Sequence, residues 1–124
     1  MHNKKIIIGL AVLILAGIVL AFVHYKLGFL TKYNSYTAKQ DIEKGDIRIL
    51  IYGELLPNEA MENKIAKTFG FRFDRVKDCT INQTFINGVN RYNNTVKHYL
   101  AGKYGRDWET LFNERLSQEM KKVP

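Results

Sequence analysis

The sequence predicts an α+β protein in which a single N-terminal transmembrane helix is followed by a small βαβ unit and a C-terminal αα-hairpin. Three features lead to this fold class: an uncharged apolar run near the N-terminus, two strand patterns separated by a helical pattern, and a long helical periodicity near the C-terminus. The 124 residues suffice for one small domain beside the apolar run. We therefore divide the chain into an anchor at residues 1–26, a membrane-proximal linker at 27–45 and a soluble domain at 46–124.

The anchor is the uncharged run IIIGLAVLILAGIVLAFV, which extends from Ile6 to Val23. As a helix it would be roughly 27 Å long, close to the thickness of the hydrocarbon core of a bilayer. Lys4 and Lys5 precede the run, and Tyr25 and Lys26 follow it, which is typical of a membrane interface. The side chains expected to contact lipid are Ile6, Ile7, Ile8, Leu13, Leu15, Ile18, Leu20 and Val23.

Two other interpretations of this run compete with a retained anchor. A cleaved signal peptide also has a basic start, and Val19-Leu20-Ala21 is a passable cleavage site, but the run exceeds the roughly 7–15 apolar residues usual in such segments. A buried core helix would need apolar partners on every side, and the rest of the chain is too short to surround it. We favour the retained anchor.

The net charge of +7 divides unevenly along the chain. Lys4, Lys5 and Lys26 flank the anchor, so residues 32–124 carry 16 basic against 12 acidic side chains, a net charge of +4. These signs are interspersed, unlike the basic stripe of a nucleic-acid-binding protein, and we expect no nucleic-acid partner. A short basic tail is costly to translocate, so we expect it in the cytoplasm and the soluble domain in the periplasm, anchored in the inner (cytoplasmic) membrane.

Two strands and an intervening helix are expected at the start of the soluble domain. The segment from Ile47 to Tyr52 alternates and is rich in isoleucine, and the segment from Phe71 to Val76 alternates aromatic with charged residues. Between them Asn58 predicts a helix start and Gly70 its end. A strand, a helix and a strand in this order predict two parallel strands. A further short strand is expected around Tyr33 to Ala38, inside the linker.

A long amphipathic helix follows. Its inward face is formed by Phe85, Val89, Tyr92, Val96, Tyr99 and Lys103, and is widened by Leu100 and Tyr104. Thr80 and Gln83 match a capping box at its start, and Gly105 ends it. Its asparagines, including Asn87 and Asn93, lie off the apolar face on the side predicted to face water. Gly88 does not fit, because glycine inside a helix costs about 1 kcal/mol relative to alanine. Either the helix begins near Asn90 or the backbone packs closely at Gly88.

A last helix is expected after Asp107, which would cap it. The apolar residues of this segment recur at helical spacing and are predicted to point inward: Trp108, Leu111, Phe112 and Leu116.

No catalytic, cofactor or metal site is predicted. His98 is the only histidine of the soluble domain and has no second histidine or carboxylate at helical spacing, so a local metal site is not expected. Cys79 is the only cysteine, which rules out an intrachain disulfide; its place at a helix start leaves a reactive thiol as the less favoured alternative to packing. The sequence contains no glycine-rich phosphate loop and no nucleophile elbow. We therefore expect a protein that is not an enzyme.

One set of residues in the soluble half resembles a known family. The elements are Lys44-Gly45-Asp46-Ile47, Tyr52-Gly53, Lys67-Thr68-Phe69-Gly70-Phe71, Asn87-Gly88, Tyr92-Asn93 and Lys103-Tyr104-Gly105 with Trp108. In this order they resemble an uncharacterised family of small bacterial proteins, common in Bacteroidetes, whose members carry a motif close to Phe-Glu-Lys-Lys-Tyr-Gly and often a signal or anchor segment. Here the segment Ile65 to Gly70 keeps the lysine, an aromatic residue and the glycine of that motif. The resemblance implies a bacterial envelope protein and no catalytic role.

These features together predict a non-enzymatic, single-pass membrane accessory protein that contacts the bilayer and another envelope protein, with a second copy of the chain as a further candidate partner. The candidate contact residues are Arg48, Leu50 and Tyr52 on the outer face of the first strand, and Arg91, Tyr92 and His98 on the long helix. The alternative is a module that binds a small ligand or a lipid headgroup in a pocket lined by Arg91, Tyr92 and Tyr99.

Overall fold

The computed structural model describes residues 2–54, 56–76 and 81–123. The protein is a mixed helix and strand fold with one long helix outside the domain. In chain order its elements are α1 (His2–Leu27), α2 (Ser35–Glu43), β1 (Arg48–Ile51), α3 (Glu59–Thr68), β2 (Arg72–Arg75), α4 (Gln83–Tyr104) and α5 (Trp108–Met120).

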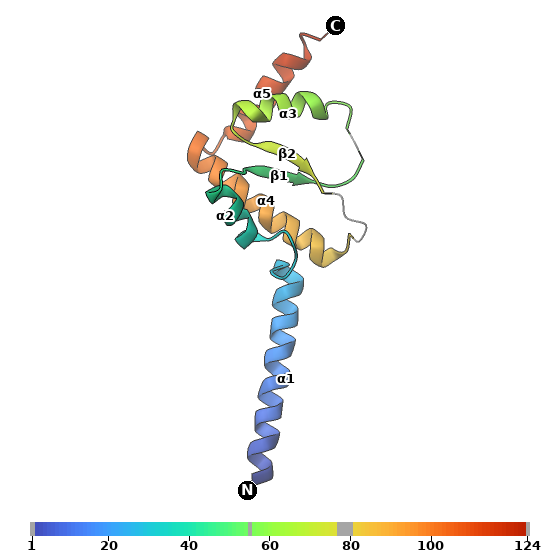
Figure 1. The fold of residues 1–124 in the computed structure, drawn as a ribbon, viewed down its shortest axis with the longest axis vertical. Helices are drawn as coiled ribbons and strands as arrows, with labels where there is room; N and C mark the ends of the chain where they lie inside the picture. The colour runs from blue at the N-terminus through green and yellow to red at the C-terminus, as the bar shows by residue number, and fades with distance from the viewer. Residues whose placement is uncertain (1, 55, 77–80, 124) are drawn as a thin grey trace.

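The helix α1 projects away from the domain, and the two chain termini lie at opposite ends of the molecule (Figure 1). Within its segment from Asn3 to Leu27, the most apolar window of 18 residues has a mean hydropathy of 3.2, and none of that window is buried. This exposure argues against a buried core helix. By length and composition α1 is able to cross a membrane, as a membrane anchor or as a signal sequence.

The two strands pair in parallel, as predicted, and each is shorter than its sequence pattern. Arg48 is opposite Arg72 and Ile51 is opposite Arg75. The two strands lie between α4, which contacts β1 on the side toward α1, and α3, which contacts β2 on the side away from α1; α2 packs on α4 and α5 packs on α3 (Figure 1). The consecutive residues Ile49 and Leu50 point to opposite faces of β1 and are both buried, so both faces of this strand are covered within the domain.

The far side of the sheet is held by aromatic packing. The rings of Phe69, Phe71 and Phe73 surround Phe112, with centroids 5.8 to 5.9 Å from it, and Phe71 also meets Trp108 edge-on at 5.7 Å. Trp108 and Phe112 point inward as predicted. The inward prediction for Leu111 is wrong, because the buried stripe of α5 follows the spacing of four that joins Trp108 to Phe112 and leaves Leu111 49% exposed.

The strand predicted around Tyr33 to Ala38 is wrong, because this segment enters the helix α2. Asn34 is the N-cap: its Oδ1 accepts hydrogen bonds from the backbone N–H groups of Tyr36 and Thr37 at 2.9 and 3.1 Å, and the Thr37 hydroxyl accepts one from Asn34 N–H. This capping box outweighs the strand preference of tyrosine and threonine. Ala38 is fully buried, so residues 27–45, expected to be a linker, contribute to the core.

The long helix α4 confirms the predicted amphipathic pattern. Its buried residues are Phe85, Gly88, Val89, Tyr92, Val96 and Leu100. The helix ends before Gly105, as predicted, and begins at Gln83 after Asn82, whose side chain accepts a hydrogen bond from Phe85 N–H at 2.9 Å. The capping box predicted at Thr80 and the role predicted for Cys79 fall outside the described residues.

Candidate functional site

The junction between α1 and α4 is built around two glycines. Gly28 ends α1 in the left-handed conformation, with φ of 59°, and its N–H donates to the carbonyl of His24. A Cβ on Gly28 would lie 2.6 Å from the Cα of Gly88, and a Cβ on Gly88 would overlap the Thr31 hydroxyl and the Tyr33 carbonyl. The structure thus decides between the two interpretations of Gly88: α4 is continuous there, and the backbones pack in contact.

Hydrogen bonds reinforce this contact. The Asn87 amide donates to the carbonyl of Tyr25 at 2.8 Å, so a side chain of α4 satisfies one of the free carbonyls at the end of α1. The Thr31 hydroxyl lies within hydrogen-bond distance of the carbonyls of Gly28 and Tyr33. These bonds fix the last turn of α1 against the domain, and we refer to residues 24–34 with Asn87 and Gly88 as the junction.

A polar cluster next to the junction joins α2, the sheet and α4. Arg48 donates to Asp41 at 2.7 Å and to Asp74 at 2.9 Å, and its Nε lies 3.3 Å from the hydroxyl of Tyr92. The Tyr92 hydroxyl in turn donates to Asp41 at 2.7 Å. One carboxylate from α2, one guanidinium from β1 and one phenol from α4 therefore form a closed triangle of hydrogen bonds.

The pKa values of these groups reflect their partners. Partial burial disfavours the Asp41 carboxylate, but hydrogen bonds from Arg48 and Tyr92 outweigh that effect and lower the pKa of Asp41 below its ordinary value of 3.8. Burial raises the pKa of Tyr92, and its hydrogen bond to Asp41 raises it further. Burial alone would lower the pKa of Arg48, but its hydrogen bonds, first that to Asp41, raise it. The cluster is thus held as an ion pair with a neutral phenol.

Two asparagines bind the backbone of the two strands. The Asn93 amide of α4 accepts from the Leu50 N–H and donates to the Leu50 carbonyl, both at 2.8 Å. The Asn63 side chain of α3 accepts from the N–H of Phe73 at 2.9 Å. These bonds satisfy backbone groups that a two-stranded sheet leaves open at its edges. The prediction that the asparagines of α4 face water is therefore wrong for Asn93, whereas Asn90 and Asn94 are exposed as predicted and Asn87 is half-buried.

The structure separates the residues predicted to contact a partner. Leu50 and Tyr92 are buried, with exposed fractions of 2% and 0%, and Arg48 is engaged in the polar cluster. These three are therefore unavailable to a partner protein. Tyr52 is 43% exposed, and Arg91 and His98 are also exposed.

An open groove between α2 and α4 contains Arg91 and His98, together with Ser35, Lys39, Asn94 and Thr95. The predicted pocket of Arg91, Tyr92 and Tyr99 does not form, because Tyr92 points into the core. A second hollow lies among α3, the end of α4 and α5. Its lining residues are Thr68, Phe69, Tyr104, Leu111, Glu114, Arg115 and Gln118.

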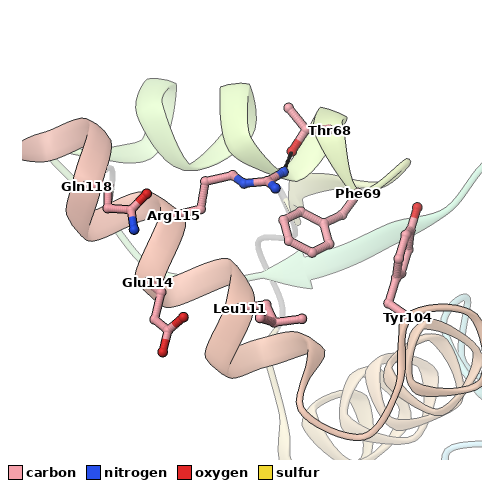
Figure 2. A pocket seen from close by; sticks show the side chains of 7 residues that line it. All are labelled: Thr68, Phe69, Tyr104, Leu111, Glu114, Arg115 and Gln118. Atoms are coloured by element: carbon pink, nitrogen blue, oxygen red, sulfur yellow. Dashed lines mark hydrogen bonds between the residues drawn. The ribbon is translucent and has the colours of Figure 1, made fainter.

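In that second hollow, Arg115 reaches across the ring of Phe69 to the hydroxyl of Thr68, while Glu114 points away (Figure 2). The guanidinium carbon lies 5.2 Å from the ring centroid, and the hydrogen bond to Thr68 measures 3.2 Å. The arginine therefore joins α5 to the end of α3, in the manner of a structural cation–π contact.

Among residues 2–54, 56–76 and 81–123, no group of three or more histidine, cysteine, aspartate or glutamate side chains could hold a metal ion. Comparisons of the chain with protein-family models, with curated proteins and with solved structures each found no match. The resemblance to the small bacterial family remains a prediction from the motif residues.

The sequence did not identify the junction or the polar cluster as sites. The anomalous Gly88 was the one available signal for the junction, because it breaks an otherwise regular helical pattern.

Proposed function

We propose that this chain is a non-enzymatic, single-pass accessory protein of the bacterial envelope, retained in the inner membrane by α1 with its domain in the periplasm. The observation that carries the proposal is the backbone contact between Gly28 and Gly88, reinforced by the bond from Asn87 to Tyr25. A flexible linker would let a domain tumble on its tether. A packed junction instead holds the domain at a set orientation to the bilayer, which suits a protein that presents one surface to a neighbour in the same membrane.

The use of the polar residues supports the same proposal. The ionisable and amide side chains that lie together inside the domain hold its elements in place: Arg48 with Asp41 joins β1 to α2, and Arg75 with Glu59 joins β2 to α3. Asn93 and Asn63 bind the sheet backbone. On this proposal the domain is a scaffold for contact with another envelope protein or with a second copy of the chain.

The test is purification of the full chain from the membranes of its own host in mild detergent. The intact mass of the purified chain distinguishes a retained α1 from a cleaved signal peptide, which would remove the residues up to about Ala21. Native size separation and mass spectrometry then identify what comigrates. A larger complex of fixed stoichiometry supports the accessory role, whereas a chain that runs alone after a cleaved N-terminus would overturn it.

A second candidate function is favoured by the groove between α2 and α4. Lys39, Arg91 and His98 line it without an ion-pair partner among the described residues, so it could take an anionic ligand such as a phosphate-bearing headgroup. Calorimetric titration of the solubilised chain with glycerol phosphate tests this alternative. Binding that is lost in Arg91→Ala would favour it, and Arg106→Ala, an exposed arginine outside the groove, is the matched control.

A further inference from the structure

The last residue of α1 and the segment directly after it expose large apolar side chains beyond the uncharged run that ends at Val23. Leu27 is 36% exposed, Phe29 is 40% exposed and Leu30 is 74% exposed, the largest exposed fraction among the exposed large apolar residues of the described chain. Scattered single apolar residues on a surface are ordinary, but here three exposed large apolar residues stand within four consecutive positions. We call residues 27–30 the apolar ledge.

The ledge folds back along the last turn of α1. The Leu30 N–H donates to Nδ1 of His24 at 3.4 Å, and the rings of Phe29 and His24 meet edge-on with centroids 5.3 Å apart. His24 is the residue that directly follows the apolar run ending at Val23. Phe29 and Leu30 therefore lie at the level where the membrane segment of α1 ends.

The ledge is held in this position by the domain. The Asn34 amide donates to the carbonyls of Phe29 and Thr31 at 3.0 and 2.9 Å, and Asn34 is itself buried as the N-cap of α2. Gly28 is fixed against Gly88. These contacts fix the backbone of the ledge. Leu30 nevertheless stays 74% exposed, so its side chain is not buried by the rest of the domain.

Cations flank the ledge on both sides. Lys26 Nζ lies 5.9 Å from the ring centroids of Phe22 and Tyr25, and Lys32 Nζ lies 5.2 Å from that of Tyr33. Apolar side chains at one level with aromatic rings and lysine amines are typical of the boundary between acyl chains and headgroups.

We infer that the apolar ledge is a second membrane contact, in which Phe29 and Leu30 enter the lipid interface of the leaflet that α1 leaves. This inference rests on the proposed membrane anchoring of α1 and goes beyond it. The occupant of the ledge is the bilayer itself, because the ledge continues the surface of α1 at the end of its apolar run. The domain then sits at the bilayer surface, held by α1 and by the ledge beside the last turn of α1.

The experiment places a fluorescent probe in the full chain. Cys79→Ser removes the only cysteine, and Leu30→Cys or Leu111→Cys then provides a single thiol for an environment-sensitive dye. Leu111 is the matched control, since it is a leucine that is 49% exposed and lies on α5, on the far side of the sheet from α1. The proteins are reconstituted in vesicles of phosphatidylethanolamine and phosphatidylglycerol, with and without a lipid that carries a nitroxide near the top of its acyl chain.

We expect blue-shifted emission at position 30 and quenching by the lipid-borne nitroxide several-fold stronger than at position 111. Equal quenching at the two positions, in chains that float with the vesicles, would overturn the inference and leave the anchoring by α1 intact. Chains that do not float with the vesicles would overturn both. A second probe at Phe29→Cys reads the same surface should the Leu30→Cys chain fail to fold, which its thermal transition in detergent reveals.

Discussion

The two ends of the domain are held together by different kinds of contact. On the side away from the membrane helix, Phe71 and Phe112 lie at the centre of an aromatic cluster with ring centroids 5.4 to 5.9 Å apart. On the side next to α1, two glycine backbones touch, and asparagine and threonine side chains bind carbonyl groups. The aromatic cluster is stabilised by buried apolar area. The junction depends on close approach and paired polar groups, and beside it Tyr33 packs edge-on against the buried rings of Phe85 and Tyr92.

The difference teaches how each region responds to change. An aromatic cluster loses stability in proportion to the apolar volume that is removed. A close backbone contact is insensitive to hydrophobicity and sensitive to any added atom. Substitutions that shrink side chains should therefore destabilise the aromatic cluster more than the junction. Substitutions that add a single methyl group should destabilise the junction more.

The largest effect is expected for Phe71→Ala in the aromatic cluster. Phe71 is 3% exposed and contacts Phe73, Trp108 and Phe112, so its truncation leaves a cavity and should lower the free energy of unfolding by about 3–5 kcal/mol. Denaturant unfolding of the full chain in detergent, followed by circular dichroism, measures this loss. Leu111→Ala, at an exposed position of α5, is the control and should change stability by no more than about 0.5 kcal/mol.

Gly88→Ala should reverse the usual sign of a glycine-to-alanine change in a helix. In an open helix the change gains up to about 1 kcal/mol. At Gly88 the new methyl group meets Thr31 and the Tyr33 carbonyl, so we expect a loss of about 1–3 kcal/mol and a looser junction. Gly102→Ala is the matched control on the same helix, because nothing lies within 4 Å of its added Cβ. A gain in stability in both variants would contradict the packed junction.

Asn93→Ala should cost about 1–3 kcal/mol, because it leaves both backbone groups of Leu50 without their partner in the core. The neighbouring Asn94→Ala, an exposed position on the same helix, should be nearly neutral. Hydrogen exchange at the Leu50 amide reports the same contact directly and should accelerate in Asn93→Ala alone. Unchanged protection of that amide would show that the side chain does not hold the strand.

The smallest effect concerns pH. The pKa of Asp41 is lowered in the folded chain, so its charged form contributes stability above its ordinary value of 3.8. That contribution is lost as the pH falls through the lower pKa of the folded state. The midpoint of thermal unfolding should therefore fall less steeply below about pH 4 in Asp41→Asn than in the unaltered chain. Parallel curves for the two proteins would mean that the polar cluster contributes no pH dependence.

Sequence patterns were sufficient wherever a contact repeats along one element. The period of the apolar residues in α4, the alternation in β1 and β2, the uncharged run of α1 and the glycine at the end of α3 each encode one local geometry, and the structure contains all four. Such a pattern can be recognised from the sequence alone, because each of its residues repeats the same local geometry toward the same neighbouring surface.

Only the tertiary structure decided the features that depend on a partner far along the chain. Asn87 and Asn93 are polar residues of the kind expected on a solvent-facing helix surface. No neighbouring residue in the sequence indicates that the backbone groups of Tyr25 and Leu50 are their partners. The segment before β1 is a capped helix, although its tyrosines and threonine favour a strand. The sequence shows that Gly88 breaks the pattern of its helix. A glycine is required there because the backbone of Gly28, 60 residues earlier in the chain, packs against it. Polar and small residues reveal their function through one specific neighbour, and that neighbour exists only once the chain has folded.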